Sequence, residues 1–290
     1  MLSNQRSPFG SSRVLALAVA LIVPAVAHSQ ASQLSRTMNQ PVAPFRIIGN
    51  IYYVGASDIA SYLIVTPAGN ILLDGGFVET APQIEANIQT LGFKLSDVKI
   101  LLNSHEHLDH AGGLAELKRL THAHLVAMAE EVPTLESGDA FPAVTPDRII
   151  HDGDTVTLGG VTMTAHLTPG HTRGCTTWTM VTKDAGNSYN VVFVGSASVL
   201  PNYKLIDRPG DPATYPGIEA DYEKTFRVLK SLPCDVFLGA HGSFYSLAQK
   251  REVMLTNPPQ NPFIDPSGYR AYITRAEAAF RAELQREHPG

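Results

Sequence analysis

The chain has 290 residues, of which 44% are hydrophobic and 17% are charged, a composition typical of a globular protein with a sizeable core. Its formal net charge is −5, and no Lys or Arg run indicates a nucleic-acid-binding surface. No basic amphipathic stretch indicates binding to a membrane surface. Because the chain has only two cysteines, a cystine framework cannot be its main source of stability.

The first thirty or so residues have the pattern of an export signal. Arg6 and Arg13 precede an apolar run over residues 14–27, which is shorter than the roughly 20 residues of a membrane-spanning helix. Small residues over 25–31 then fit a signal-peptidase cleavage pattern. We predict that residues 1–31 form a cleaved signal peptide and that residues 32–290 form one periplasmic domain without membrane association. A retained membrane anchor is the alternative.

Further along the chain, strand and helix signals alternate. Strands are expected within 47–77 and at 98–103, with an amphipathic helix at 80–91 between them, followed by a short helix at 114–120 and a strand at 124–127. Two strands within 148–170, two more at 176–182 and 190–195, a helix at 222–232, a short strand at 234–239 and a final helix at 268–287 complete the pattern. This order occurs once in each half and predicts an α/β fold, a four-layer αββα sandwich of two related halves.

Potential metal ligands are concentrated in residues 104–110 (SHEHLDH), directly after an expected buried strand. Alternate residues of an extended segment point the same way, so His105 and His107 can face one metal ion, and Asp109 and His110 can reach a second. Imidazole and carboxylate donors at this density favour zinc over iron or manganese. A solvated polar loop is the alternative, but a glycine pair ends the segment where a helix must begin.

Two other histidines lie in loops that follow expected strands. His171 is surrounded by turn-forming residues in TPGHTRG, and His241 by those in LGAHG. Loops at strand ends are common places for functional side chains. Taken singly, each is equally compatible with an ordinary loop histidine.

The motif H-x-H-x-D-H over residues 105–110 resembles the signature of the metallo-β-lactamase superfamily, and the similarity extends from APFRIIGNIYYVG to NPFIDPSGYRAY. Within the superfamily, the chain looks like the third subclass of zinc β-lactamases, whose site uses only His and Asp. The resemblance implies the αββα sandwich of that family and two zinc ions per chain with a hydroxide between them. The implied ligands are His105, His107 and His171 for one zinc, and Asp109, His110 and His241 for the other.

One segment separates the chain from other members of this family. Glyoxalase II and many related hydrolases carry a bridging Asp after a late strand, and several β-lactamases carry a Cys ligand there. Here the segment reads FVGSAS over residues 193–198. Because the neutral Ser196 cannot bridge two cations as a carboxylate does, the second zinc is expected to keep open positions for water and substrate.

The resemblance also implies roles for residues around the metals. Asp109 should orient the hydroxide as well as bind zinc, and Tyr203 is similar to a family tyrosine that donates to the developing oxyanion. Asp74 resembles a family acid that lies beneath the metal site rather than on it. The segment 139–146, with Phe141, is expected to form an apolar flank over the pocket. The candidates for holding the substrate carboxylate are Ser196, Ser198 and Lys204. For these three residues and for Tyr203, plain loop residues are the alternative.

The expected function is hydrolysis of the lactam C–N bond of β-lactam antibiotics, including penicillins, cephalosporins and carbapenems, by a zinc-bound hydroxide in a monomer that confers antibiotic resistance. One alternative is another hydrolase of the family, a lactonase or thioesterase. The other is a periplasmic zinc-binding protein without turnover. Cys175 and Cys234 are expected to be free thiols, because they begin separate strands and the C-terminal cysteine with which some relatives pair the equivalent of Cys234 is absent.

Overall fold

The computed structural model describes residues 1 and 36–288, so almost all of the predicted signal peptide lies outside the described residues. The expected α/β architecture is confirmed, with two sheets and helices outside them. Within the described residues, no helix combines the length and hydropathy needed to cross a bilayer. The first sheet contains β1 (Phe45–Ile48), β2 (Ile51–Tyr53), β3 (Tyr62–Thr66), β4 (Gly69–Leu73), β5 (Val98–Leu102), β6 (His124–Met128) and β7 (Arg148–Ile150).

The second sheet comes from the later half of the chain, and the helices come from both halves. The second sheet has the strand order β12-β11-β10-β9-β8. Its strands are β8 (Thr155–Leu158), β9 (Val161–Leu167), β10 (Thr176–Asp184), β11 (Asn187–Val194) and β12 (Val236–Gly239). The helices are α2 (Ala81–Thr90), α3 (Leu108–Ala111), α4 (Leu114–Thr121), α5 (Val132–Ser137), α6 (Ile218–Ser231), α7 (Leu247–Met254) and α8 (Pro266–Glu287).

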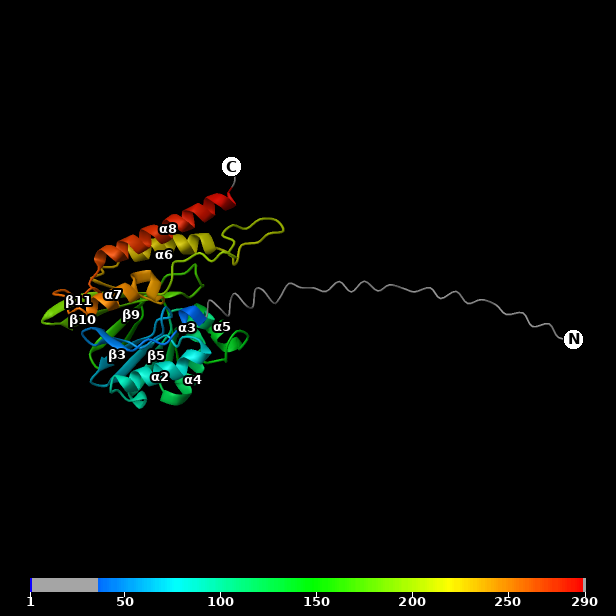
Figure 1. Ribbon diagram of the computed structural model, residues 1–290. Coiled ribbons are helices and arrows are strands. Elements are labelled where there is room, and N and C mark those ends of the chain that lie inside the picture. The colour runs from blue at the N-terminus through cyan, green and yellow to red at the C-terminus, as the bar shows by residue number, and fades with distance from the viewer. Residues whose placement is uncertain (2–35, 289–290) are drawn as a thin grey trace.

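Figure 1 shows the four layers in order: α6 and α8, the second sheet, the first sheet, and then α2 and α4. Each half follows the same plan, because an antiparallel pair is followed by an outer helix and a parallel strand. In the first half these elements are β3, β4, α2 and β5, and in the second they are β10, β11, α6 and β12. The two related halves that the sequence order predicts are therefore visible in the strand pairing.

Two apolar clusters hold the layers together. One fills the space between the sheets and extends to α6 and α8, and the other lies between the first sheet and α2 and α4. Trp178, the only tryptophan, is fully buried in the first cluster, and its Nε1 donates to the carbonyl of Asn103 at 3.0 Å. That contact joins β10 to the end of β5. The core therefore fixes the place where the metal-binding segment begins.

Candidate metal centre

Both sheets contribute strand ends to the same edge of the sandwich. The HxHxDH segment follows β5, and His241 follows β12, the equivalent strand of the other half. Backbone hydrogen bonds join the two edges, from Thr176 N to Ser104 O at 2.7 Å and from Ala60 N to Ala240 O at 2.9 Å. Loops that are distant in the sequence therefore meet over one edge of the core.

Two glycine pairs fix the segment that carries the motif. The amide of Gly113 donates to Gly76 O at 3.0 Å, and the amide of Gly75 donates to His110 O at 2.8 Å. A Cβ atom on Gly113 would lie 2.2 Å from Gly75 O, which no side chain tolerates without movement. The absence of a side chain there lets α3 and the end of β4 approach closely enough to orient Asp109 and His110.

The first group of donors is the predicted set His105, His107 and His171. One ligand atom from each lies within 4.8 Å of the others. His171 Nδ1 donates to Ser198 O at 2.8 Å, and His105 Nδ1 lies 3.0 Å from Ser104 Oγ. These contacts leave Nε2 of both rings free, and Nε2 of His105 is buried without a hydrogen-bond partner among the described atoms. A buried polar atom without a partner fits a metal ligand.

Burial keeps this first group in the state that binds a metal. It lowers the pKa of His107 to about 4, although Asp109 opposes the shift, and it lowers the pKa of His171 to about 3. The pKa of His105 is also well below its usual range, because the ring is fully buried and the other imidazoles lie around it. All three rings are therefore neutral near pH 7, and a neutral imidazole has the lone pair that a metal requires.

The second predicted group, Asp109, His110 and His241, is even more compact. Nε2 of His110 lies 3.2 Å from Nε2 of His241 and 3.3 Å from Asp109 Oδ2, and His241 Nε2 lies 3.6 Å from the same oxygen. Tetrahedral zinc with bonds of about 2.0–2.1 Å places its ligands about 3.3 Å apart. The three donor atoms therefore have the separations that a tetrahedral zinc ion requires.

Asp74 lies beneath the second group, as predicted. Its Oδ1 accepts the amide of Ser104 at 2.6 Å, and its Oδ2 is 3.6 Å from His110 Nδ1. Although burial opposes the change, the carboxylates of Asp109 and Asp74 raise the pKa of His110. Asp74 also has a φ of +64°, a backbone conformation uncommon for a residue with a side chain. The acid therefore connects the end of β4 to the motif without joining the donor set.

Sequence reasoning missed Asp58, which lies on the loop between β2 and β3. Its Oδ2 accepts Nδ1–H of His241 at 2.9 Å, and its Oδ1 accepts the amide of Ser243 at 2.6 Å. Although burial alone would raise it, these hydrogen bonds lower the pKa of Asp58 below its ordinary value. The carboxylate therefore fixes the ring of His241 with Nε2 directed at Asp109 and His110.

Tyr203, the predicted oxyanion donor, lies beside the first group. Its hydroxyl donates to the carbonyl of His171 at 2.6 Å and is 3.4 Å from Nε2 of His107. Burial raises the pKa of this hydroxyl to about 12, so Tyr203 remains protonated at neutral pH. The structure therefore places a stable hydrogen-bond donor next to the metal-binding imidazoles.

The three candidates for the substrate carboxylate have other contacts. Ser196 is only 1% exposed, and its Oγ accepts the amide of Ser198 at 3.3 Å. The carbonyl of Ser198 accepts His171 Nδ1 and the hydroxyl of Tyr222, so this residue orients a ligand. Lys204 Nζ lies 3.4 Å from Asp211 Oδ2. Of the three, the two serines thus lie within the wall of the site, and Lys204 lies on the adjoining loop.

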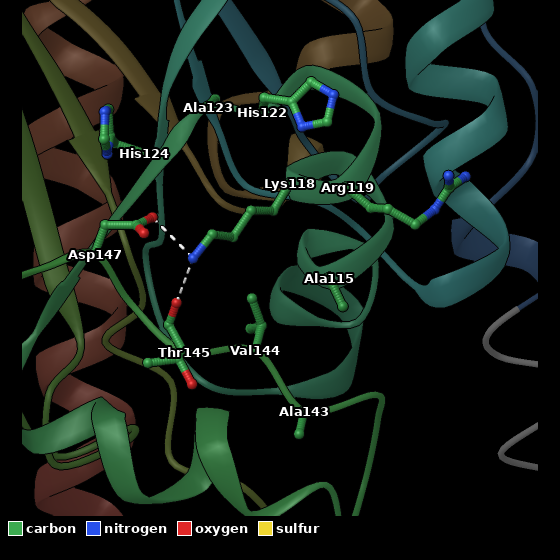
Figure 2. Close-up of a pocket in the computed structure, with 10 residues that line it drawn as sticks. All are labelled: Ala115, Lys118, Arg119, His122, Ala123, His124, Ala143, Val144, Thr145 and Asp147. Atoms are coloured by element: carbon green, nitrogen blue, oxygen red, sulfur yellow. Dashed lines mark hydrogen bonds and ion pairs between the residues drawn. The ribbon is translucent and has the colours of Figure 1, made fainter.

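Phe141 does not project as an open flank, because it is 5% exposed and packs in the apolar cluster beneath the first sheet. Its neighbours, including Val144, line a surface cavity of about 490 Å³ beside α4, which Figure 2 shows. Both basic side chains in that cavity already have acidic partners: Lys118 lies 2.8 Å from Asp147 and donates to Thr145 O at 2.6 Å, and Arg119 lies 2.7 Å from Glu116. None of the six metal donors lines this cavity.

The fold and the paired donor groups agree with the comparison to known proteins. The profile of the metallo-beta-lactamase superfamily matches residues 54–241. The chain belongs to this superfamily and is a metal-dependent hydrolase, with His and Asp groups suited to a metal such as zinc.

Its structural neighbours include subclass B3 metallo-β-lactamases. The chain is 48% identical to the FEZ-1 metallo-beta-lactamase from Legionella gormanii, with a TM-score of 0.83 over 87% of this chain and 99% of that one. It is 42% identical to BJP-1 of Bradyrhizobium japonicum, with a TM-score of 0.81 over 87% and 97% of the two chains. It is also 33% identical to a hydroxyacylglutathione hydrolase of Rhodopseudomonas palustris over 116 residues, 40% of this chain and 41% of that protein. The chain spans less than half the length of the first curated relatives that it matches.

Proposed function

We propose that this protein is a di-zinc β-lactamase that hydrolyses the lactam C–N bond of penicillins, cephalosporins and carbapenems. The observation that carries the proposal is the pair of His and Asp donor groups at one edge of the sandwich, with the neutral Ser196 where other family hydrolases carry a bridging acid. Support also comes from the 48% identity to the FEZ-1 enzyme over most of both chains. Export by residues 1–31, a single periplasmic domain over 32–290 and a monomeric state belong to the same proposal.

Each group in the site has a separate task. When bound, the two metal ions would supply a water of lowered pKa and polarise the substrate carbonyl. Asp109 would bind metal and accept a hydrogen bond from that water. Tyr203 is the nearby hydroxyl that would donate to the oxygen that gains charge as the carbonyl is attacked, for which its single proton would turn from the carbonyl of His171 to the substrate. The carboxylate of Asp58 holds His241 at its Nδ1 atom, and the carbonyl of Ser198 holds His171 at its Nδ1 atom.

The proposal is tested by offering zinc-loaded protein a panel of β-lactams, lactones and acyl-glutathione thioesters. We expect β-lactam hydrolysis, including that of a carbapenem, which a chelator abolishes and added zinc restores. His166→Ala is the matched control, because His166 lies on β9 and contacts Thr179 rather than the donor groups. Hydrolysis of thioesters with no action on β-lactams would instead indicate the activity of the hydroxyacylglutathione hydrolases.

Metal analysis tests the two-site arrangement independently of turnover. Two zinc ions per chain are expected under zinc-replete conditions. His241→Ala should weaken binding at the second group more than at the first, and His171→Ala should do the reverse. One zinc ion in the unmutated protein would contradict the two-site arrangement.

A further inference from the structure

The loop between β11 and α6 is the part of the site with the least regular structure. It covers residues 195–217 and carries Ser198 and Tyr203. Connections longer than about 12–15 residues without a helix or strand of their own are uncommon and are often functional. Its short internal contacts, between Lys204 and Thr214 and between Arg208 and Asp211, fold the outer part of the loop onto itself. Anchors from outside the loop hold its inner part next to the metal groups, among them the hydroxyls of Tyr272 and Tyr222, which contact Ala197 N at 3.2 Å and Ser198 O at 2.7 Å.

Glu287, the last residue of α8, supplies such an anchor. Its two carboxylate oxygens accept the amide of Leu205 at 3.0 and 2.9 Å, and Oε2 also accepts the amide of Ile206 at 3.0 Å. Glu287 is 6% exposed, and Leu205 is 2% exposed. A buried carboxylate that accepts from adjacent backbone N–H groups forms charge-assisted hydrogen bonds, which are stronger than those between neutral groups. These contacts begin two residues after Tyr203.

The location of this carboxylate is unfavourable for the helix alone. The C-terminal end of a helix has a partial negative charge, so an acidic side chain in the last turn is repelled. The neighbouring cation, Arg286, directs its guanidinium at both oxygens of Glu283. Glu287 is instead buried against the loop, whose amides donate hydrogen bonds to its carboxylate. The residue therefore contributes to the loop rather than to the helix on which it lies.

We propose that Glu287 is a positioning residue that fixes the loop 195–217, so that the hydroxyl of Tyr203 stands beside the first metal-binding group. This inference rests on the proposed function, because it assigns Glu287 an effect on turnover through Tyr203. Glu287 itself touches neither donor group in its described contacts. Its loss should release Leu205 and Ile206 while the six metal donors remain in place.

The test compares Glu287→Ala and Glu287→Gln with the control Gln285→Ala, an exposed residue in the same last turns of α8. In zinc-loaded Glu287→Ala, the amides of Leu205 and Ile206 should exchange hydrogen at least roughly tenfold faster, because each loses a bond to a charged acceptor. Glu287→Gln should recover part of this protection through its carbonyl oxygen. The control should exchange as the unmutated protein does, and all variants should bind the same amount of zinc.

Turnover separates positioning from a general loss of stability. Glu287→Ala should lower kcat on β-lactams more than it changes KM, and it should add little further loss in a Tyr203→Phe background. Unchanged exchange at Leu205 and Ile206, or a full additional loss of kcat in that background, would overturn the inference. If the unmutated protein hydrolyses no β-lactam, the proposed function fails, whereas hydrogen exchange still decides whether Glu287 holds the loop.

Discussion

At the scale of single residues, most metal-binding imidazoles have one nitrogen held by a neighbour and one left free. His171 is held by the carbonyl of Ser198, and His241 is held by the carboxylate of Asp58. Such contacts select the tautomer and restrict ring rotation before a metal arrives. A carboxylate partner adds negative charge, so we expect Asp58 to contribute more to metal affinity than a neutral acceptor does.

Replacing Asp58 with Asn should therefore weaken the second metal site. The amide keeps the size of the side chain but loses the charge and one of the two acceptor oxygens, so it cannot accept from both His241 Nδ1 and the amide of Ser243. Changes to such partners typically reduce metal affinity by about 10–100-fold. Competition with a chromophoric chelator measures both affinities, with the exposed Asp97→Asn as the control. Equal weakening at both sites, or no weakening, would contradict this role.

The six donors could be predicted from the sequence, whereas Asp58 could not. His105, His107, Asp109 and His110 share one short motif, and turn residues surround the other two histidines. Asp58 lies 183 residues before His241 and has no motif of its own. Its role arises only where the loop between β2 and β3 meets the end of β12. Asp74 was predicted through family resemblance rather than from its surroundings.

At the scale of elements, these predictions succeeded for helices whose apolar residues recur over two turns or more. The expected helix at 80–91 is α2, that at 114–120 is α4, and that at 268–287 is α8. Helix α5 was missed, because six residues that contain a proline give too few turns for a recognisable period. The segment 139–146 was expected to form an apolar flank over the pocket, but the structure buries its Phe141 in the core. Side-chain direction in such a loop depends on tertiary packing.

The contact between the two glycine pairs gives a prediction at this scale. Gly113→Ala should lower the free energy of unfolding by about 1–3 kcal/mol, as overpacking typically does, because its Cβ would approach Gly75 O. Metal affinity should fall as well, since α3 would move. Urea unfolding followed by the fluorescence of Trp178 measures the stability. Gly92→Ala, which has a φ of +85° and meets no atom within 4 Å, is the control for backbone strain alone and should leave metal binding unchanged.

At the scale of the whole molecule, the buried imidazoles make the metal-free protein sensitive to acid. The pKa of His107 falls from 6.5 to about 4 and that of His171 to about 3, so the unfolded chain binds more protons than the folded chain between pH 6.5 and those values. Stability must therefore decrease as the pH falls through this range. His110, whose pKa is raised, opposes this trend only near and above pH 6.5, where the unfolded histidine is not yet fully protonated, so the three buried neutral imidazoles outweigh it below that pH.

We therefore expect the free energy of unfolding of chelator-stripped protein to be lower at pH 5 than at pH 7. Urea titrations at the two pH values, followed by Trp178 fluorescence, provide the measurement. His124→Gln is the control, because His124 is exposed. Its removal should leave the difference between the two pH values unchanged. An equal or higher stability at pH 5 would show that the buried imidazoles do not dominate the acid response.

The last prediction concerns what holds the whole fold together. Cys175 and Cys234 are both free thiols, and burial raises the pKa of Cys175 and brings that of Cys234 to about 12. Reducing agent should therefore leave the Tm unchanged. A chelator should lower it, because a ligand that binds only the native state at 100 times its Kd stabilises that state by about 2.7 kcal/mol.

For a chain of this size, each kcal/mol shifts the Tm by roughly 2–4 °C, so each zinc ion held at that ratio should raise it by roughly 5–10 °C. Thermal unfolding with reductant, with chelator and with chelator followed by excess zinc separates the two contributions. Thiol titration of unfolded, unreduced protein should find two reactive groups per chain. A Tm that reductant lowers and chelator leaves unchanged would mean that a covalent bridge, rather than the metal centre, stabilises this sandwich.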